Sequence, residues 1–213
     1  MTNGIIGKKI GMISLFTLEG NQIPVSVVEA GPCYVTQVKK DSTDGYNSVQ
    51  LGFGKKKKKL INKPISGHLA KSIENKDIAP FSILKEFRVN NPDDFEPGQK
   101  ISLSNVFKIG EKINVSGTIK GRGFSGVVKR HGFHGGKKTH GSMSHRIPGS
   151  IGCSATPGRV LKGKKLPGQY GNTRQTVKNL EVIDIRESDN VILLKGSVPG
   201  CKSGILELKK IKQ

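Results

Sequence analysis

The chain has 213 residues, of which 34% are apolar and 28 are glycines, so it can form one or two domains but has little core-forming material. Its 36 Lys and Arg against 16 Asp and Glu give a formal net charge of +20, which repels the chain from itself unless a polyanion neutralises it and favours a nucleic-acid partner. A membrane partner is excluded by the lack of a long apolar run, a basic amphipathic helix or a lipidation signal, and three widely spaced cysteines exclude a disulfide framework or zinc site.

The first part of the chain carries the signals of short strands. Residues 1–12 interrupt their few apolar side chains with Gly and Lys, which fits neither a secretory signal peptide nor an organelle-targeting segment. We therefore expect the protein to stay in the reducing compartment where it is made. Residues 23–28, 34–38 and 48–53 are rich in β-branched residues, with a turn at 30–32 between the first two. We expect these runs to pair antiparallel.

The middle of the chain gives weaker signals. The lysine run at 55–59 fits a solvated hairpin tip and a phosphate contact about equally well. The pattern of residues 64–78 favours a short helix, and strands are predicted at 83–89 and 100–103. We expect residues of about 55–100 to form a small mixed α/β insertion.

The positive charge is concentrated in one segment, from residue 112 to residue 180. These 69 residues contain 14 Lys or Arg, 14 Gly and four of the five His, but no Asp or Glu. A solvated, flexible basic loop is one interpretation, yet such a loop has no need to exclude every carboxylate. A segment lying against phosphates does, because each carboxylate would add repulsion in a low-dielectric contact. The pattern favours continuous contact with RNA or DNA, and the glycines would let the backbone approach closely.

Two motif-like patterns inside this segment lack the residues that their chemistry needs. Residues 121–128 match the glycine loop of nucleotide-binding proteins, but no carboxylate follows until Glu181 to hold a ribose or a metal. Residues 158–164 resemble a phosphate-binding loop, yet Lys165 stands where a Ser or Thr must bind magnesium. Neither pattern predicts a nucleotide site.

Four histidines of the segment are of a residue type that can bind metals, but their surroundings do not favour a metal site. They lie amid strong positive charge without a carboxylate or a paired cysteine, which makes them poor ligands for a cation. Hydrogen bonding to RNA or stacking on its bases is the favoured interpretation. The four are His131, His134, His140 and His145. We expect no metal, no cofactor, no small-molecule substrate and no catalytic residue.

Strand signals resume after the basic segment, at 176–185, 191–195 and 204–210. Because the basic segment interrupts a set of short strands, we expect a mainly β fold: a closed β-barrel with a long basic, Gly-rich extension. Within the extension, residues 124–131 are the one stretch that favours a helical turn. The expected parts are the barrel, residues 1–111 and 172–213, and the extended loop, residues 112–171.

Several stretches match the pattern of one known family. Residues 107–130 have a Phe, an Asn seven residues later, a Gly-Arg-Gly core at 121–123 and a closing Gly-x-x-x-Arg. This segment resembles the signature of the ribosomal protein L3 family, in its bacterial or organellar type. Similar stretches continue at 5–12, 23–39, 139–177 and 193–200, whereas 55–100 match least well.

The resemblance implies a β-barrel of the translation-factor type on the outer surface of the large ribosomal subunit, with a long loop threading rRNA toward the peptidyl-transferase centre. It also implies a role in early subunit assembly, contacts with neighbouring large-subunit ribosomal proteins, and a ribosome of the cytoplasm or of an organelle. In some bacterial relatives a Gln before the Thr-Pro of the loop is methylated. Ala155 stands at that position, so we expect no such modification.

Two sets of residues are candidates for rRNA contact. The first set shares positive charge in the acid-free segment and is expected to bind phosphates: Lys120, Arg122, Lys129, Arg130, Lys137, Lys138, Arg146, Arg159, Lys162, Lys164, Lys165 and Arg174. The second set is the small, uncharged apex of the loop, which the resemblance places near the peptidyl-transferase centre: Gly152, Cys153, Ser154, Ala155 and Thr156. Small side chains suit packing against RNA by shape.

Two other classes of protein remain as alternatives. An enzyme acting on RNA would need a paired acid and base or a metal site within the basic segment, which has no carboxylate. Another basic RNA- or DNA-binding structural protein, such as a histone-like one, is usually smaller and helical or dimeric. The sequence therefore predicts a structural rRNA-binding protein without catalytic activity.

Overall fold

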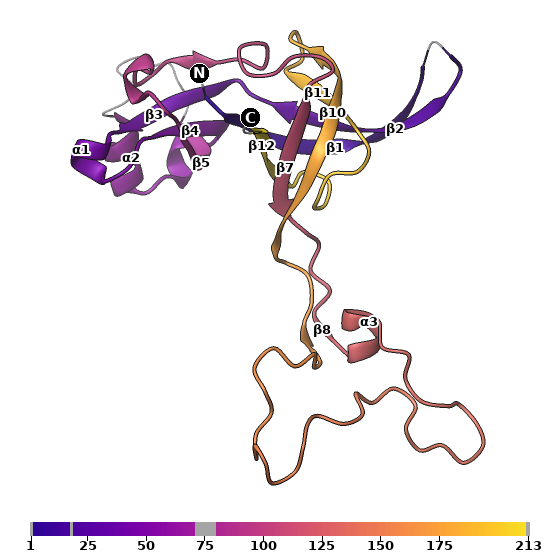
Figure 1. Ribbon diagram of the computed structural model, residues 1–213. Coiled ribbons are helices and arrows are strands. Elements are labelled where there is room, and N and C mark those ends of the chain that lie inside the picture. Colours follow the sequence, from indigo (N-terminus) through magenta and orange to yellow (C-terminus); the bar gives the residue numbers. More distant parts are fainter. Residues whose placement is uncertain (1, 18, 71–79, 212–213) are drawn as a thin grey trace. The chain divides into compact units, whose positions relative to one another are not determined.

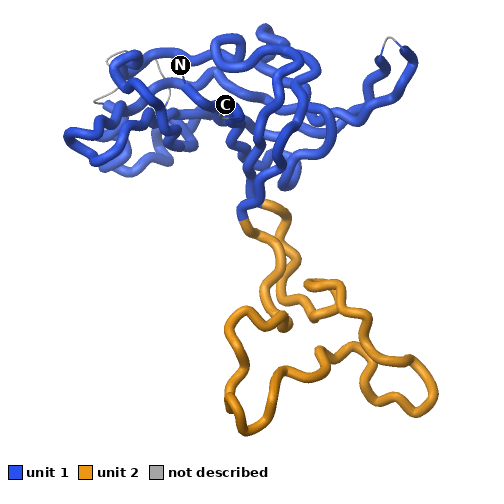
Figure 2. Tube along the Cα trace, viewed as in Figure 1, with its two compact units in different colours: residues 1–118, 174–213 blue, residues 119–173 orange. Residues whose placement is uncertain are grey.

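The structure is a computed structural model that describes residues 2–17, 19–70 and 80–211. It divides into two units, the first made of Met1–Thr118 and Arg174–Gln213 and the second of Ile119–Thr173 (Figure 2). The first unit holds a closed barrel and a second sheet. The second unit is inserted in the chain between two strands of the barrel. Within the described residues, no helix is both long and apolar enough to cross a membrane.

Six antiparallel strands close the barrel in the order β1-β12-β7-β10-β11-β2 (Figure 1). Closure depends on the two ends of the chain, because β1 pairs with β12 through the register Gly4↔Lys209. Within the closed barrel itself, no strand edge is left open to aggregation. The prediction of a mainly β fold with a closed barrel is confirmed. The strands are β1 (Gly4–Phe16), β2 (Gln22–Ala30), β7 (Lys112–Thr118), β10 (Arg174–Arg186), β11 (Val191–Lys195) and β12 (Ile205–Lys210).

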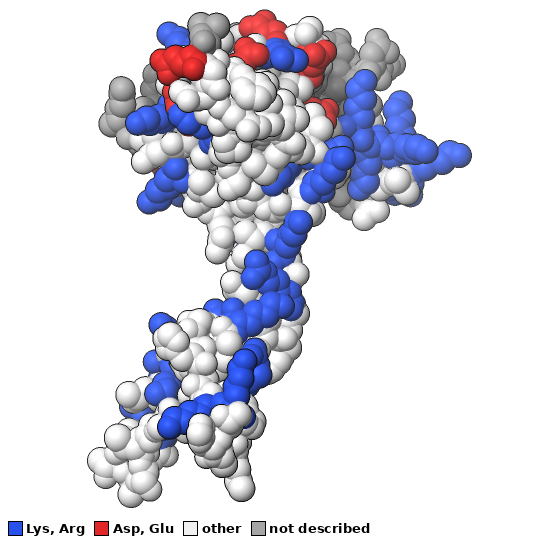
Figure 3. Space-filling view, turned by 90° about the vertical axis from the view of Figure 1, so that its right-hand side faces the viewer, with Lys and Arg blue, Asp and Glu red and all other residues white. Residues whose placement is uncertain are grey.

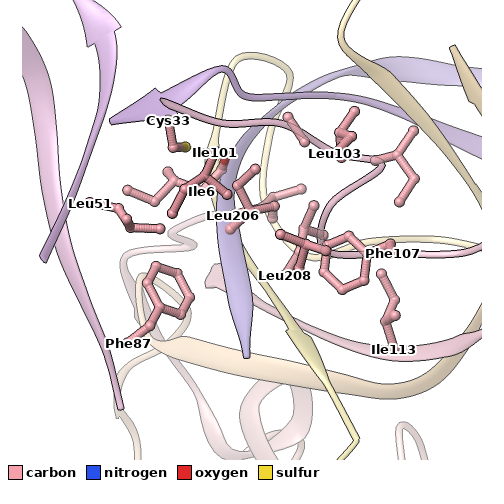
Figure 4. Close-up of a cluster of buried hydrophobic side chains, with 14 of the residues drawn as sticks. Ile6, Cys33, Leu51, Phe87, Ile101, Leu103, Phe107, Ile113, Leu206 and Leu208 are labelled. Carbon is pink, nitrogen blue, oxygen red and sulfur yellow. Dashed lines mark hydrogen bonds between the residues drawn. The ribbon is translucent and has the colours of Figure 1, made fainter. Parts of the chain in front are cut away.

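The barrel is filled by side chains that alternate along its strands. Leu206 and Leu208 of β12 point inward and are fully buried, and Glu207 between them is not. Ile113 of β7 and Phe107, which precedes β7, lie in the same cluster (Figure 4). Ile5 of β1, which is paired with Leu208, points to the same side, whereas Ile6, which is paired with Glu207, is buried on the other face of β1. Each such side chain contributes about 1.5–3 kcal/mol when it leaves water.

Between β2 and β7 the chain forms a second antiparallel sheet in the order β5-β4-β3-β6. Its inner side chains, among them Leu51 and Phe87, join the same core cluster (Figure 4). The insertion was expected at about 55–100, but this sheet already begins at Cys33. The reason is that β3 and β4, which precede residue 55, pair with each other and not with the barrel strands. The strands are β3 (Cys33–Lys39), β4 (Ser48–Lys55), β5 (Phe81–Arg88) and β6 (Lys100–Ile101).

Short helices connect the strands of this sheet. The helix predicted at 64–78 is present as α2 (Lys63–Ala70), and residues 71–78 of that prediction lie outside the described residues. Part of the lysine run at 55–59 ends β4 and part begins a 3-10 turn. The remaining elements are α1 (Asp41–Asp44) and the 3-10 turns η1 (Lys58–Leu60) and η2 (Pro92–Asp94).

The first strand, β1, was not predicted, because glycines and lysines interrupt its apolar residues. The structure shows why glycine stands there. A Cβ on Gly4 would collide with the Leu208 carbonyl and the Phe87 ring, and one on Gly7 would lie 2.8 Å from a Val28 methyl group. These glycines allow β1 to approach its neighbours closely, which periodicity along the chain does not reveal.

The boundary of the basic unit also differs from the expected one at residue 112. Residues 112–118 form β7 inside the barrel, where Val115 pairs with Leu208 on one side and with Val177 on the other. The last barrel pair before the second unit is Thr118↔Arg174. The loop predicted at 112–171 therefore corresponds to residues 119–173, and its first seven residues belong to the barrel.

Two Phe→Ala substitutions test the position of the core. We expect Phe107→Ala to lower the free energy of unfolding by about 3–5 kcal/mol, because it removes a ring that is 1% exposed and leaves a cavity. The matched variant Phe16→Ala removes a ring that is 72% exposed and should change stability by less than about 0.5 kcal/mol. Urea unfolding followed by circular dichroism measures both, and equal losses would contradict this assignment of the core.

Candidate nucleic-acid interface

The unit of residues 119–173 begins as a paired stem. The Ile119 N–H donates to the Thr173 carbonyl over 3.0 Å, and the Arg122 N–H donates to the Tyr170 carbonyl over 2.8 Å. The two chains of the stem then form the short strand pair β8 (Phe124–Ser125) and β9 (Gly168–Gln169). The stem follows directly on β7 and β10, whose last pair is Thr118↔Arg174. The two ends of the unit therefore pair with each other.

Two glycines allow backbone segments of this unit to touch. Gly171 has a φ of +72°, and a Cβ there would collide with the Lys120 carbonyl across the stem. At Gly136 a Cβ would collide with the Ser144 carbonyl, and the Gly136 N–H donates to the His145 carbonyl over 3.0 Å. The second contact closes a smaller loop. Both are positions where only glycine fits.

A short helix, α3 (Val127–His131), follows β8 and confirms the helical turn predicted at 124–131. Its Arg130 Nη1 donates to the Leu166 carbonyl over 2.7 Å, and His131 Nε2 lies 3.1 Å from the same oxygen. These contacts tie the outgoing chain to the returning chain. Arg130, a predicted phosphate ligand, is half-buried and uses at least one donor inside the protein.

Beyond α3, residues 132–166 are all described and form no helix or strand. Most of their large apolar side chains are exposed, such as Met143 at 96% and Leu161 at 61%, and Phe133 and Leu166 are half-buried. Among the described residues of the whole unit, Val127 is the one large apolar side chain that is buried. The unit thus has almost no core of its own, and packing alone cannot offset the entropy of ordering it.

The charge of the unit is uncompensated. It contains 11 Lys and Arg and no Asp or Glu, so no ion pair can form within it. Figure 3 shows Lys and Arg along its visible face, whereas Asp and Glu appear on the other unit. Ten of the candidate phosphate ligands lie exposed here: Lys120, Arg122, Lys129, Lys137, Lys138, Arg146, Arg159, Lys162, Lys164 and Lys165.

Arg174 is placed differently from these ten. It is the first residue of β10, in the barrel unit, and its Nη2 forms an ion pair with Glu207 of β12. The same carboxylate is 3.6 Å from Lys85 Nζ and 3.5 Å from Lys209 Nζ. Glu207 is thus surrounded by cations, and Arg174 contributes to joining two barrel strands.

The structure adds aromatic residues that the charge pattern did not identify. The Arg122 guanidinium carbon lies 4.9 Å from the centre of the Tyr170 ring, and the nearby Phe124 ring is 78% exposed. The exposed Phe124 ring is suited to stacking on an unpaired base, and the half-buried Tyr170 ring already stacks with Arg122. The sequence signal that could have identified these positions is the occurrence of aromatic residues within a basic, Gly-rich segment.

Two of the four histidines contact backbone carbonyls of the unit itself. His145 Nδ1 lies 3.0 Å from the Lys137 carbonyl, and His131 lies near the Leu166 carbonyl as described above. The His131 and Phe133 rings are 6.1 Å apart between centroids. These imidazoles therefore help to order the backbone of the unit, while stacking on RNA stays a prediction.

Every residue of the apex, 152–156, is exposed. A Cβ on Gly152 would lie 3.9 Å from the Arg159 carbonyl, and one on Gly158 would lie 3.2 Å from the Ala155 carbonyl. The chain therefore turns back on itself within these few residues. The apex presents small side chains on a tight turn, with Arg146 and Arg159 as the nearest charges along the chain.

Comparison with known proteins gives one consistent family. The family model described as ribosomal protein L3 matches residues 86–191. The large ribosomal subunit protein uL3 of Desulfatibacillum aliphaticivorans is 60% identical over 212 residues, which cover 100% of this chain and 98% of the relative. The uL3 proteins of Syntrophotalea carbinolica and Thermotoga petrophila are each 50% identical, and the matches cover 98% or more of this chain and 97% or more of each relative.

Hydrogen exchange of the free protein tests the missing core of the basic unit. We expect fast amide exchange at residues 137–166, where backbone hydrogen bonds are local and long, such as Lys164 N–H to the Leu161 carbonyl at 3.3 Å. Strand β12, paired on both sides, should exchange slowly. Added rRNA should slow exchange in the loop. Strong protection of the loop without RNA would mean that it is a self-standing domain.

Proposed function

The chain belongs to the ribosomal protein L3 family, and we propose that its unit of residues 119–173 is the part that binds large-subunit rRNA. As a member of this family the protein is a structural constituent of the large ribosomal subunit and not an enzyme. One observation carries the proposal. The unit has 11 cations, no carboxylate and a single buried large apolar side chain among its residues, so its charge and its missing core both call for a polyanionic partner.

In this proposal the cations divide into two roles. The ten exposed Lys and Arg of the unit are available for phosphate contacts, because no carboxylate within the unit neutralises them. Arg130 holds the stem through the Leu166 carbonyl, and Arg174 holds the barrel through Glu207. The barrel serves as a stable base from which both chains of the stem emerge. A six-stranded antiparallel barrel together with family membership supports assigning it to the translation-factor type, with residues 119–173 as its Gly-rich extension.

The glycines of the extension support close approach of the RNA backbone. Unlike Gly136 and Gly171, the glycines Gly126, Gly149 and Gly163 have no protein atom within 4 Å of the position that a Cβ would take. The protein's own packing does not require glycine at Gly126, whose φ is −67°. A phosphate or ribose lying against the backbone there would require it.

The apex is assigned to the neighbourhood of the peptidyl-transferase centre. The support is the family resemblance of residues 139–177 together with the exposed turn of small, uncharged side chains at 152–156. A protein that contacts several RNA segments through one extension is also suited to act early in subunit assembly. The partners are large-subunit rRNA and neighbouring ribosomal proteins.

The salt dependence of rRNA binding tests the phosphate contacts. Each contact contributes about −0.7 to −0.9 to the slope of log affinity against log salt, so contacts from about half of the ten exposed cations predict a slope of about −4. Replacing Lys162, Lys164 and Lys165 with Gln should reduce the magnitude of the slope by about 2 to 3. A control replaces three exposed lysines of the other unit, Lys100, Lys108 and Lys112, with Gln.

The control triple removes the same charge and should leave the slope nearly unchanged. Binding of a purified rRNA fragment, measured by filter retention at several salt concentrations, provides all three slopes. If both triples flatten the slope equally, binding depends on total charge and not on the extension.

Substitutions at the apex test its separate role. Ala155→Trp enlarges a small side chain on the exposed turn without removing a cation, so we expect nearly normal subunit assembly but altered sensitivity to inhibitors of peptide-bond formation. Replacing Lys162, Lys164 and Lys165 with Glu should impair assembly itself, because three phosphate contacts become repulsive. Sucrose-gradient profiles and growth with such inhibitors separate the two effects. An Ala155→Trp variant that blocks assembly while its inhibitor response stays normal would make the apex a structural anchor.

A further inference from the structure

Strands β1 and β2 continue past the barrel as a two-stranded hairpin, residues 10–24 (Figure 1). β1 pairs with β12 from Gly4 to Lys8, and β2 pairs with β11 from Val25 to Glu29. Farther along, the described residues of β1 and β2 pair with each other as far as Phe16↔Gln22. The free part of β1 spans about 20 Å at about 3.3 Å per residue. The Pro24 carbonyl still accepts a hydrogen bond from the Gly196 N–H over 2.8 Å. Beyond it, the outer edges of the hairpin have no third strand among the described residues.

The tip of this hairpin is held by specific hydrogen bonds. The Thr17 N–H donates to the Asn21 carbonyl and the Gly20 N–H to the Thr17 carbonyl, both over 2.9 Å. The Asn21 N–H also donates to Thr17 Oγ1 over 3.1 Å, and Gly20 has a φ of +82°. These bonds close the turn and keep the two strands in register. The hairpin is therefore organised before any partner arrives, which lowers the entropic cost of binding.

Large apolar side chains are exposed along the hairpin. Phe16 is 72% exposed, Met12 and Ile13 are each 47% exposed, and Ile10 is 40% exposed. Because successive side chains of a strand point to opposite faces, Met12 and Phe16 share one face and Ile13 lies on the other. An isolated two-stranded hairpin is marginally stable in water. Exposed apolar side chains gathered on such a hairpin indicate a surface that another molecule covers.

The charge of the hairpin argues against rRNA as that molecule. Residues 10–24 contain no Lys or Arg and one carboxylate, Glu19, although the whole chain carries 36 cations in 213 residues. A surface without cations gains nothing from phosphates, and Glu19 is repelled by them. The extension shows the opposite composition, with cations throughout and no carboxylate. The two surfaces therefore suit different partners.

We propose that the hairpin of residues 10–24 docks on a neighbouring ribosomal protein that presents an apolar surface bordered by basic side chains. This inference rests on the proposed function, because it assumes that the chain is part of the large subunit. Glu19 at the tip complements a basic border, and Phe16 is the large aromatic anchor typical of the centre of a protein interface. The free edges of the two strands can add a strand of the partner through backbone hydrogen bonds.

Two crosslinking probes at matched positions test the partner. A photoreactive phenylalanine analogue replaces Phe16 in one full-length chain and Phe124 in another, since the two rings have similar exposure. Each chain is assembled into large subunits in cells, and the subunits are purified, irradiated and examined by mass spectrometry. We expect the probe at Phe16 to crosslink to one ribosomal protein and the probe at Phe124 to crosslink to rRNA.

The two probes separate failure of this inference from failure of the proposed function. If the Phe124 probe enters large subunits and reaches rRNA, the proposed function stands. In those conditions, a Phe16 probe that crosslinks to rRNA, to a second copy of this chain, or to nothing overturns the docking proposal. If neither chain enters the large subunit, the proposed function itself is wrong.

A second measurement tests the anchor. With the photoreactive analogue moved to Met12, we expect Phe16→Thr to lower the yield of the protein crosslink by about tenfold, because the aromatic anchor is lost. Threonine favours strands, so the hairpin should persist. The matched variant Ser14→Thr, on the same face and strand, should leave the yield unchanged. Equal yields from the Phe16→Thr and Ser14→Thr variants would contradict the docking surface.

Discussion

Electrostatic repulsion among the 11 cations of residues 119–173 is the constraint on which the rest of the structure depends. Without a carboxylate the unit forms no internal ion pair, and with Val127 as its one buried large apolar side chain it has almost no hydrophobic core. In the proposed function, a polyanion provides the order that this segment cannot gain from its own packing. Stability of the free protein must therefore come from the other unit, where six strands close a barrel that the two ends of the chain complete.

The cations around the stem and in the loop serve two different purposes. Arg130 and Arg174 bind groups of the protein itself: Arg130 donates to the Leu166 carbonyl, and Arg174 pairs with Glu207. Both contacts join segments that are far apart in the chain. Lys162, by contrast, is exposed in a unit that offers it no anion. Phosphate contacts determine position and affinity rather than sequence preference, so a protein using them needs a fixed base. The stem provides the link between that base and the cations.

The hairpin of residues 10–24 and the extension differ in chemistry as well as in place along the chain. The extension is cationic and rich in glycine, and the exposed part of the hairpin is apolar with the single charge of Glu19. A ribosomal protein that meets both rRNA and other proteins needs surfaces of both kinds. The two kinds of surface lie on different segments. An apolar contact of the hairpin therefore does not remove water from the cations that the RNA contact requires.

The sequence by itself determined the mainly β class, the strands at 23–28 and 176–185, the acid-free segment and its apex, because these depend on local alternation, β-branched residues and charge. Family membership was also readable from residues 107–130. Only the tertiary structure decided what depends on pairing between distant segments. It assigned residues 112–118 to the barrel, explained Gly4 by the Leu208 carbonyl and Phe87, and gave Arg130 and Arg174 partners 36 and 33 residues away. Those roles depend on the segments that the closed barrel and the stem bring together. Residue spacing along the chain does not indicate which distant segments will meet.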